Sequence, residues 1–487
     1  DRYFLTRELV TVMALVSPAL IFLRRQIFGA TQIVPTHYWF PYYSFSPMEI
    51  LRDLYLSSWR HGLAGKPSIF LTTGLPTGIL FNLPSMLLGS AMWSRFVTFI
   101  LLASTLVTYY AFLRRTIGLN ALGAFLGALF AGFNLWVIGY TLASRNNAIV
   151  LSYVCLPISL HFAKLYLAKN QMTHALLSGL MIALSFSHQV SGLIVFVSTV
   201  LYVSAEVGVH LRRHEAGRVL VKTAILISVY VLAVSYILPH IYWAWTDPAA
   251  VLVIPSLHDT STQLTKLTGI SGIEVLRPPY PFLGLIDWPE AQGLLVPVTL
   301  LLVLSIAATL SRREAQLCPF LLLYTISAYM AKGLNQPFPG LYLALFDLHP
   351  ILAMVMRDPL HWLLVVNMCA AVFVASTTHS VCEKLREHSL VKRTRNILGL
   401  IRGHISPLLI MGVLILATVQ VVHMNSNVLE RDLPSLPEYY DDAIVYLNEQ
   451  LAKDTFRMYF PGSRYATSYE WMSKNTPDVF LEVPILG

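Results

Sequence analysis

The sequence predicts an all-α integral membrane protein of about eleven transmembrane helices with long loops on the outer face. Two observations support the membrane assignment. Only 12% of the residues are charged while 55% are hydrophobic, and the charges are collected between long apolar runs. A soluble domain carries about a quarter charged residues, so this pattern indicates that lipid surrounds the chain.

The apolar runs give the predicted helices. They cover residues 8–23, 93–113, 119–139, 146–168, 172–187, 190–210, 218–240, 292–310, 317–331, 360–378 and 404–422. A spanning helix needs about 20 residues, and several of these runs are shorter than that. The stretch 76–90 is short and broken by Pro76 and Pro84, so we expect a re-entrant or interfacial segment there.

Basic residues orient these helices. If the chain starts in the cytoplasm, every even-numbered helix ends there, and each such exit is basic. These exits carry Arg114 and Arg115, Lys164 and Lys169, Arg212 and Arg213, Arg312 and Arg313, and finally Lys384, Arg386, Lys392, Arg393 and Arg395. Because cytoplasmic loops accumulate Lys and Arg, we expect a multi-pass plasma-membrane protein with its N-terminus inside. The same rule accounts for the net charge of +8, so no nucleic-acid partner is expected.

The predicted topology divides the chain into two parts. Residues 1–422 form one polytopic domain, with a first outer loop at 24–92 and further outer loops at 241–290 and 332–359. Residues 423–487 form an acidic tail that reads as a small helix followed by a strand. A segment of about 65 residues buries little surface alone, so this small α/β tail is expected to pack on the outer loops.

Candidate functional residues collect on the predicted outer side. The first outer loop holds the ionisable residues His37, Glu49 and Asp53 between aromatic residues that include Trp39 and Trp59. Carboxylates act as bases, and aromatic faces stack on sugar rings. The alternative for the tryptophans is the aromatic belt found at any membrane interface.

Three further candidates stand at predicted helix ends on the same side. Arg145 lies at the turn between the third and fourth helices, His188 at the turn between the fifth and sixth, and Arg357 before the tenth. Arginine binds phosphate through two parallel hydrogen bonds, and a charge at a membrane boundary usually has a partner or a ligand. For Arg357 the alternative is a local pair with Asp358.

Other chemistries find little support. The four cysteines form no CxxC pair, no HExxH sequence occurs, and no metal ligands are assigned. His174 and His188 have a spacing suited to haem, but no second helix carries a matching pair, so haem is not expected. A divalent metal cofactor stays open. Glu206 is the only carboxylate inside the predicted spans beyond the first, which disfavours ion transport.

Four stretches of the sequence resemble a known superfamily. They are "THYWFPYYSFSPMEILRDLYLSSWRHGLAGKPSIF", "GALFAGFNLWVIGY", "KGLNQPFPGLYLALFDLHPILAMVMRDPLHW" and the tail from "LPEYYDDAIVYLNEQL" to "FRMYFPGSRYATSYEW". Together they resemble GT-C membrane glycosyltransferases of the arabinofuranosyltransferase-like kind. The resemblance implies transfer of a sugar from a polyprenyl-phosphate donor to an envelope glycan or glycolipid acceptor at the outer face. It also implies a carboxylate in the first outer loop that acts as base or helps bind a divalent metal.

The chain departs from that pattern where the carboxylate is expected, because Pro35-Thr36-His37-Tyr38 contains no acid. Glu49 and Asp53 are the nearest acids, and their spacing places them on one helix face. They could instead solubilise an amphipathic interfacial helix. His37 could replace the acid as base, although Mg²⁺ prefers oxygen ligands. Two hypotheses follow: an outer-face sugar transferase, or an inactive GT-C-like subunit of a larger respiratory or cell-envelope complex with protein partners.

Overall fold

The computed structural model of the chain describes a subset of its residues. The described residues are 2–24, 27, 59–60, 66–67, 80, 83–88, 90–138, 140–141, 147–211, 216–236, 303, 305–307, 310, 315–335, 338–348, 352, 355–356 and 359–391. Their regular structure is helical apart from two short antiparallel strands, β1 (Trp59–Arg60) and β2 (Lys66–Pro67), in the first predicted outer loop. Within this part of the chain, the prediction of an α-helical protein is confirmed.

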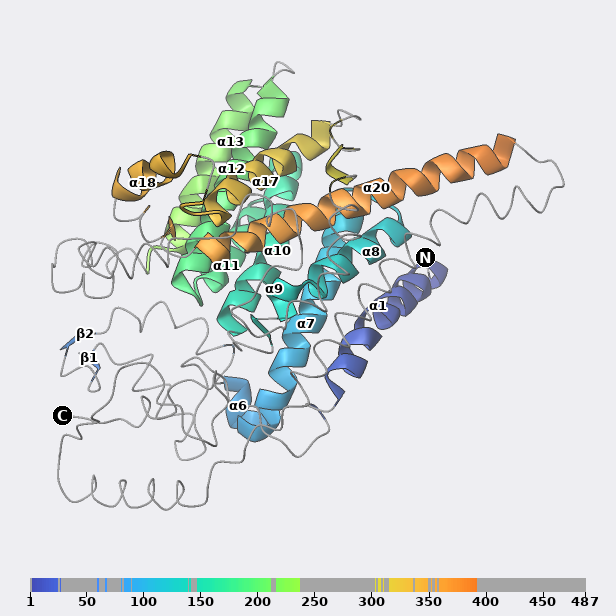
Figure 1. Ribbon diagram of the computed structural model, residues 1–487, viewed down its shortest axis with the longest axis horizontal. Coiled ribbons are helices and arrows are strands. Elements are labelled where there is room, and N and C mark those ends of the chain that lie inside the picture. Colours follow the sequence, from blue (N-terminus) through green and yellow to red (C-terminus); the bar gives the residue numbers. More distant parts are fainter. Residues whose placement is uncertain are drawn as a thin grey trace.

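The helices follow the apolar runs along the chain. They are α1 (Arg2–Phe22), α6 (Leu83–Leu88), α7 (Ser90–Arg115), α8 (Ala121–Gly132), α9 (Leu135–Ile138), α10 (Asn147–Lys169), α11 (Met172–Ser185), α12 (Gln189–Leu211), α13 (Ala216–Ala233), α17 (Cys318–Ala331), α18 (Pro339–Leu348) and α20 (Leu363–Val391), with 3-10 turns η7 (Ala315–Leu317) and η8 (Pro359–Trp362). Figure 1 shows them gathered into one bundle that α20, drawn in orange, crosses.

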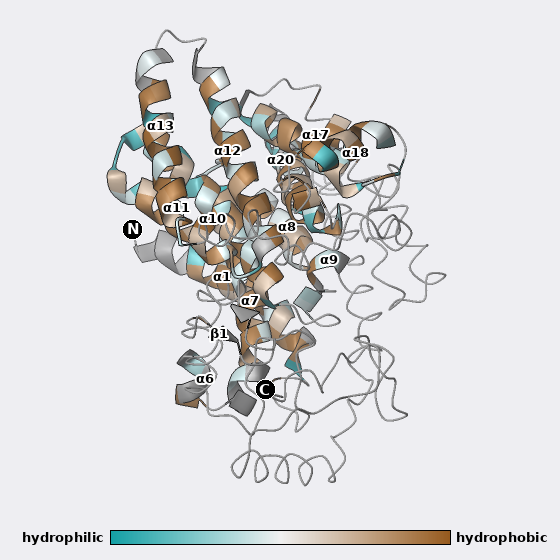
Figure 2. Cartoon of the chain, turned by 90° about the vertical axis from the view of Figure 1, so that its left-hand side faces the viewer, coloured by the Kyte–Doolittle hydropathy of each residue, from teal (hydrophilic) through white to brown (hydrophobic). Residues whose placement is uncertain are grey.

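Among the described residues, four helical stretches are long and apolar enough to cross a membrane. They are Phe96–Arg115, Asn147–Lys169, Val190–Gly208 and Pro359–Glu383. Figure 2 shows the hydrophobic residues, in brown, distributed along the helices. Shorter apolar helices lie within the predicted runs 8–23, 119–139, 172–187, 218–240 and 317–331. The protein is therefore a helical membrane protein, while the count of eleven spans stays a prediction, with 404–422 and most of 292–310 outside the described residues.

The structure differs from the predicted elements in two places, 119–139 and 332–359. The run 119–139 contains two helices, because the chain turns at Phe133 and Asn134 between α8 and α9. In the stretch 76–90, which is predicted not to span, the described helix α6 is only 6 residues long, too short to cross the bilayer. The predicted outer loop 332–359 contains the 10-residue helix α18.

The core of the bundle is built around α20. Every residue from Leu363 to Ala375 is buried, and α20 packs against α8 and α17. Two glycines of α8 let the helices approach closely, since a Cβ atom on Gly123 would stand 2.7 Å from the carbonyl oxygen of Ala375. On Gly127 it would stand 2.6 Å from the Cβ of Ala375. Small residues at helix crossings are typical of membrane bundles, where close packing takes the place of a hydrophobic driving force.

A second set of helices is joined by buried hydroxyl groups. Ser178 of α11 donates to the carbonyl oxygen of Ser159 in α10 (2.9 Å) and pairs with the hydroxyl of Tyr230 in α13 (2.8 Å). The hydroxyls of Ser159 and Thr199 of α12 are 3.1 Å apart. Ser152 donates to the carbonyl oxygen of Ser185 at 2.7 Å, which fixes α10 and α11 as an antiparallel pair.

Charged side chains gather at one end of this bundle, which we call the charged end. Arg114 pairs with Glu8 (3.1 Å), and Lys164 lies 3.9 Å from Glu206. The imidazole of His379 lies 3.4 Å from Glu383. The basic residues Arg114 and Lys164, which the sequence assigns to predicted cytoplasmic exits, therefore lie at helix ends and bind partners from other helices. That this end faces the cytoplasm stays a prediction.

Candidate functional site

A row of neighbouring rings, one edge-to-face pair followed by two stacked pairs, lies at the opposite end of the bundle. We call its members, Trp136, Tyr140, His361 and His188, the ring stack. The N-terminal turns of α10, α12 and α20 lie at this end. The residues of the charged end on the same helices, Lys164, Glu206 and His379, lie four or more turns further along. Four segments distant in the sequence contribute to this end: α9 with residues 140–141, the start of α10, the turn at 186–188 and η8.

Asn134 sets the position of Trp136. Its side-chain amide donates to the carbonyl oxygen of Ala131 at the end of α8, and its Oδ1 accepts from the backbone N–H of Val137 at 3.0 Å. An asparagine at this position caps the new helix while it ends the preceding one. The indole of Trp136 is consequently turned toward η8, where its Nε1 donates to the carbonyl oxygen of Leu360 at 3.1 Å.

The rings follow one another from α9 to the turn before α12. The ring centroids of Trp136 and Tyr140 are 4.7 Å apart, and those of Tyr140 and His361 are 6.1 Å apart. His361 stacks on His188 at 4.8 Å with an interplanar angle of 29°. Trp136, Tyr140 and His361 are buried, whereas His188 is only partly covered. The ring stack thus leads from the bundle core toward its surface.

Local hydrogen bonds fix both histidines at the ends of helices. His188 precedes α12, and its Nδ1 lies 3.0 Å from the hydroxyl of Ser191 and accepts from the Ser191 backbone N–H at 3.3 Å. This is a capping arrangement for the first turn of α12. His361 belongs to η8, which Trp362 holds by donating from Nε1 to the carbonyl oxygen of Val355 at 3.2 Å.

Asn147 adds a buried acceptor to this end of the bundle. The antiparallel pairing of Ser152 with residue 185 places Asn147, about one and a half turns earlier in α10, at the level of His188. Its side chain is 5% exposed, and among the described residues its Oδ1 has no hydrogen-bond partner. A buried acceptor without a donor costs about 1–3 kcal/mol, so it suits a place where a ligand supplies the donor.

Of the residues predicted as functional, His188 is described in full. His37, Trp39, Glu49, Asp53, Arg145 and Arg357 lie outside the described residues, and for Trp59 only the backbone, in β1, is described. Asp358, the suggested partner of Arg357, also lies outside. The structure does describe residues next to these two arginines in the sequence. They are Asn147 beside Arg145, and Met356 and Pro359 beside Arg357, and they belong to the segments that meet at the ring stack.

Sequence reasoning missed three members of the ring stack, Trp136, Tyr140 and His361. The sequence does contain a signal for these residues. An Asn-x-Trp sequence interrupts an apolar run at 134–136, and a His-Trp pair at 361–362 directly precedes the long helix α20. The two suggested haem ligands, His174 and His188, are not on one helix, since α11 ends at Ser185. His174 instead lies beside Phe162, with the two ring centroids 6.1 Å apart.

Within the described residues no group of three or more His, Cys, Asp or Glu side chains stands close enough to hold a metal ion. The carboxylates that the superfamily resemblance would use for a metal, Glu49 and Asp53, lie outside the part of the chain that the structure describes. Among the described residues, this end of the bundle presents aromatic rings, imidazole nitrogens and an amide oxygen. Such groups are able to stack on other rings and to form hydrogen bonds.

Comparison with known proteins supports the fold. No protein-family model and no curated protein matches the sequence. Among solved structures, the single-particle cryo-EM structure of arabinofuranosyltransferase AftD from mycobacteria matches with a TM-score of 0.62 at 15% identity. The match covers 96% of this chain and 30% of that chain. At this identity the likeness shows the fold alone, and the predicted resemblance to arabinofuranosyltransferases is supported as a likeness of fold.

Proposed function

We propose that this chain transfers a sugar from a polyprenyl-phosphate donor to an envelope glycan or glycolipid acceptor at the outer membrane face. The fold match with an arabinofuranosyltransferase, over 96% of the chain, carries the proposal. The match covers only 30% of the arabinofuranosyltransferase. The activity proposed for this chain therefore rests on the shared fold alone. We take arabinofuranose as the first sugar to test.

The ring stack supports the proposal by its chemistry. Aromatic rings form apolar platforms for the faces of sugars, and His188 is the partly exposed member of the stack. The acceptor oxygen of Asn147 suits a sugar hydroxyl as donor. Asn147 follows Arg145 by two residues in the sequence, and η8, which contains His361, begins two residues after Arg357. These two arginines are the proposed phosphate clamps.

The proposed reaction is a displacement at the anomeric carbon. A base, for which His37, Glu49 and Asp53 are the candidates, takes the proton from an acceptor hydroxyl. The acceptor oxygen forms the new bond to the anomeric carbon as the bond to the phosphate oxygen breaks. Polyprenyl phosphate leaves with the bonding electron pair, which the two arginines stabilise. Trp39 and Trp59 are the proposed acceptor platform.

Transfer by the purified full chain in nanodiscs, with polyprenyl-phosphate arabinofuranose as donor, tests this proposal. We expect H37A, E49Q or D53N to lower the transfer rate by about 10²–10⁴, whichever removes the base. E383Q is the matched control, since Glu383 is an exposed carboxylate at the charged end. Normal transfer by the triple variant would overturn these assignments. An inert wild-type chain that copurifies with stoichiometric partner subunits would favour the alternative, an inactive subunit of a larger complex.

A further inference from the structure

Helix α18 exposes apolar side chains although it is too short to cross a membrane. Its 10 residues span about 15 Å, half of the roughly 30 Å hydrocarbon core. Leu341 is 54% exposed and Leu348 is 71% exposed, and Phe338, just before the helix, is 69% exposed. Asp347 is the only charged residue in the helix. In water this surface would be unfavourable, since it is a contiguous apolar stripe.

The exposed residues occupy one side of α18. Leu341, Ala344 and Leu348 are spaced by three and four residues, so they form a stripe along the helix. Tyr342 and Phe346, four residues apart on the opposite face, are buried against the protein. The helix therefore rests on the bundle by one side and presents an apolar stripe on the other, as interfacial helices do.

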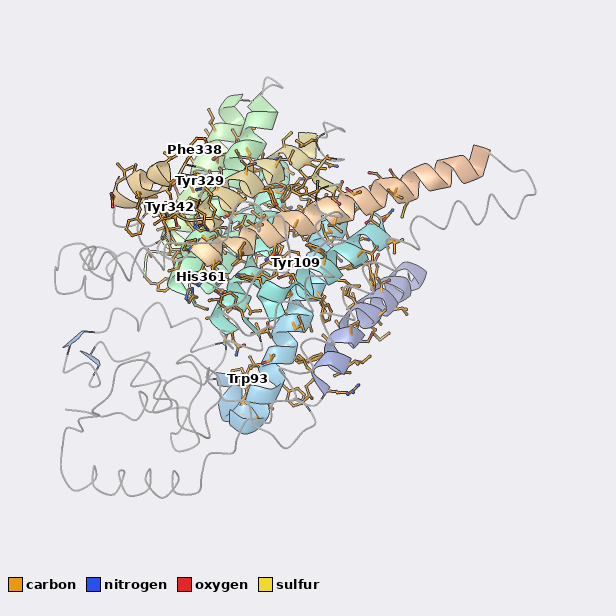
Figure 3. The ribbon with its side chains drawn as sticks, viewed as in Figure 1. Trp93, Tyr109, Tyr329, Phe338, Tyr342 and His361 are labelled. Atoms are coloured by element: carbon orange, nitrogen blue, oxygen red, sulfur yellow. The ribbon has the colours of Figure 1, made fainter. Side chains whose placement is uncertain are left out.

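Contacts with α17 and with the ring-stack end hold this orientation. The hydroxyl of Tyr329 in α17 donates to the carbonyl oxygen of Phe338 at 3.2 Å, and the rings of Tyr329 and Tyr342 are 6.5 Å apart. Phe338 has a positive φ of 63°, a conformation that a bulky residue keeps only when its surroundings enforce it. Figure 3 shows Phe338, Tyr329 and Tyr342 grouped at the same edge of the bundle.

The same edge carries an aromatic residue of a kind typical of the boundary between lipid and water. Tyr329, in the last turn of α17, is partly exposed. Tyrosine side chains at helix ends anchor membrane proteins at the level of the lipid headgroups. Leu322 of α17 is likewise exposed, at 44%, so α17 and α18 both expose leucine side chains.

We propose that α18 is an interfacial helix whose Leu341–Ala344–Leu348 stripe, with Phe338, inserts into the adjacent lipid leaflet. The bilayer then positions the candidate site, because α18 is connected to it through two hydrogen bonds. The hydroxyl of Tyr342 donates to the carbonyl oxygen of Met356, and the Nε1 of Trp362 donates to that of Val355. His361 is the neighbour of Trp362, so lipid contact at α18 holds the ring stack at the membrane surface.

A fluorescent label reports the surroundings of α18 without any assay of transfer. The full chain, with the partly or fully exposed Cys318 and Cys382 replaced by serine, receives one new cysteine and the environment-sensitive dye NBD. The test position is L348C. L232C is the lipid-facing reference, since Leu232 of the apolar helix α13 is 70% exposed against 71% for Leu348, and N170C in an exposed turn is the aqueous reference.

The labelled proteins are reconstituted into phosphatidylcholine vesicles with or without brominated acyl chains. We expect loss of NBD fluorescence at Leu348 on bromination, as at Leu232, with the greater loss from bromines placed nearest the headgroups. No such loss is expected at Asn170. A label at Leu348 that behaves like the one at Asn170 would overturn the proposal. So would a label shielded from both lipid and water, which would indicate a second copy or a protein subunit on α18.

A second labelling position guards against a misfolded variant. If L348C does not yield a monodisperse protein, L341C, on the same stripe, takes its place with the same expected outcome. Because quenching does not depend on sugar transfer, a protein without transferase activity can still have the interfacial helix. Conversely, an active transferase whose α18 label reports water would disprove the interfacial helix alone.

Discussion

The two ends of the helix bundle are fastened by different means, although the same helices reach both. At the charged end, long side chains reach across from one helix to another, as Arg114 does to Glu8 and to the carbonyl oxygen of Leu119. At the ring-stack end, flat rings with few rotatable bonds pack at centroid distances of 4.7–6.1 Å. Partly exposed charged pairs hold their helices together loosely, whereas buried rings hold the segments around them rigidly.

The same difference is seen where α8 and α9 pack against α20 and the turn η8 that precedes it. At the charged end, the backbone N–H of Asn120 donates to Nδ1 of His379 at 3.2 Å. At the other end, the fully buried Trp136 donates to Leu360 and also contacts the rings of Tyr140 and Tyr153. A binding site needs a rigid support for its first layer of residues. The comparison therefore favours the ring-stack end as the working end of the molecule.

Replacing Trp136 should give the largest effect. Trp136→Ala removes a fully buried ring with two aromatic neighbours and one hydrogen bond, and we expect a loss of about 3–5 kcal/mol of unfolding free energy. Trp136→Phe keeps a ring but loses the N–H donor, so its cost should be about 1 kcal/mol. Denaturant unfolding of the full chain in detergent micelles measures both. Equal losses for the two variants would show that the hydrogen bond to Leu360, rather than ring packing, fastens this end.

The charged end should respond less to the loss of a partner. Glu206 is 7% exposed, accepts from the hydroxyl of Tyr202 at 2.8 Å and lies 3.9 Å from Lys164. Lys164→Met leaves the carboxylate with Tyr202 alone. Because Lys164 is 31% exposed and the contact is long, we expect a cost at the lower end of the range for an unsatisfied buried group, about 1 kcal/mol.

The double variant Lys164→Met with Glu206→Gln serves as the control for that experiment. Removing both charges leaves no buried carboxylate without its cation, so most of the lost stability should return. Together with Glu206→Gln alone, the same unfolding measurement gives the coupling free energy between the two residues. A double variant less stable than Lys164→Met alone would mean that Glu206 acts mainly through Tyr202, and the charged end would then resemble the other end in its rigidity.

The part of the fold that the sequence predicted rests on local signals. Apolar runs place α7, α10, α12 and α20 because hydropathy is read within one window of residues. The run 119–139 was predicted as one helix because it stays apolar throughout, while the break depends on the capping side chain of Asn134. Hydropathy alone leaves α18 inside the predicted outer loop 332–359, since its 10 residues fall below the length of a span.

The candidate site was harder to predict because its members meet only through tertiary packing. Trp136 and Leu360 are 224 positions apart in the sequence, and His188 and His361 are also contributed by distant segments. The position of polar residues at helix boundaries makes His188, Arg145 and Arg357 candidates, and their role in a site stays a prediction. Buried aromatic residues give no such signal, since most of them belong to ordinary cores.

The smallest expected effect concerns Lys332, the one buried lysine among the described residues, which lies at the margin of the ring-stack end. Its ammonium donates to the carbonyl oxygens of Gly333 (3.2 Å) and Asn335 (2.7 Å), and burial lowers the pKa of this lysine below its ordinary value. The unfolded chain therefore binds more protons between the folded and unfolded pKa values. Stability should rise with pH across that window, up to about 10.4, and be lowest where both states are charged.

Comparison with Lys332→Met isolates this contribution, because other lysines and tyrosines titrate in the same range. The midpoint temperature of thermal unfolding is followed from pH 7 to pH 10 for both proteins, and the wild type should gain on the methionine variant as the pH rises. Lys332→Arg keeps its charge throughout and should show no such gain. A gain by the arginine variant equal to that of the wild type would assign the effect to other groups. In that case the two carbonyl oxygens and the Tyr329 ring would hold the ammonium group of Lys332 as firmly as packing holds the ring stack.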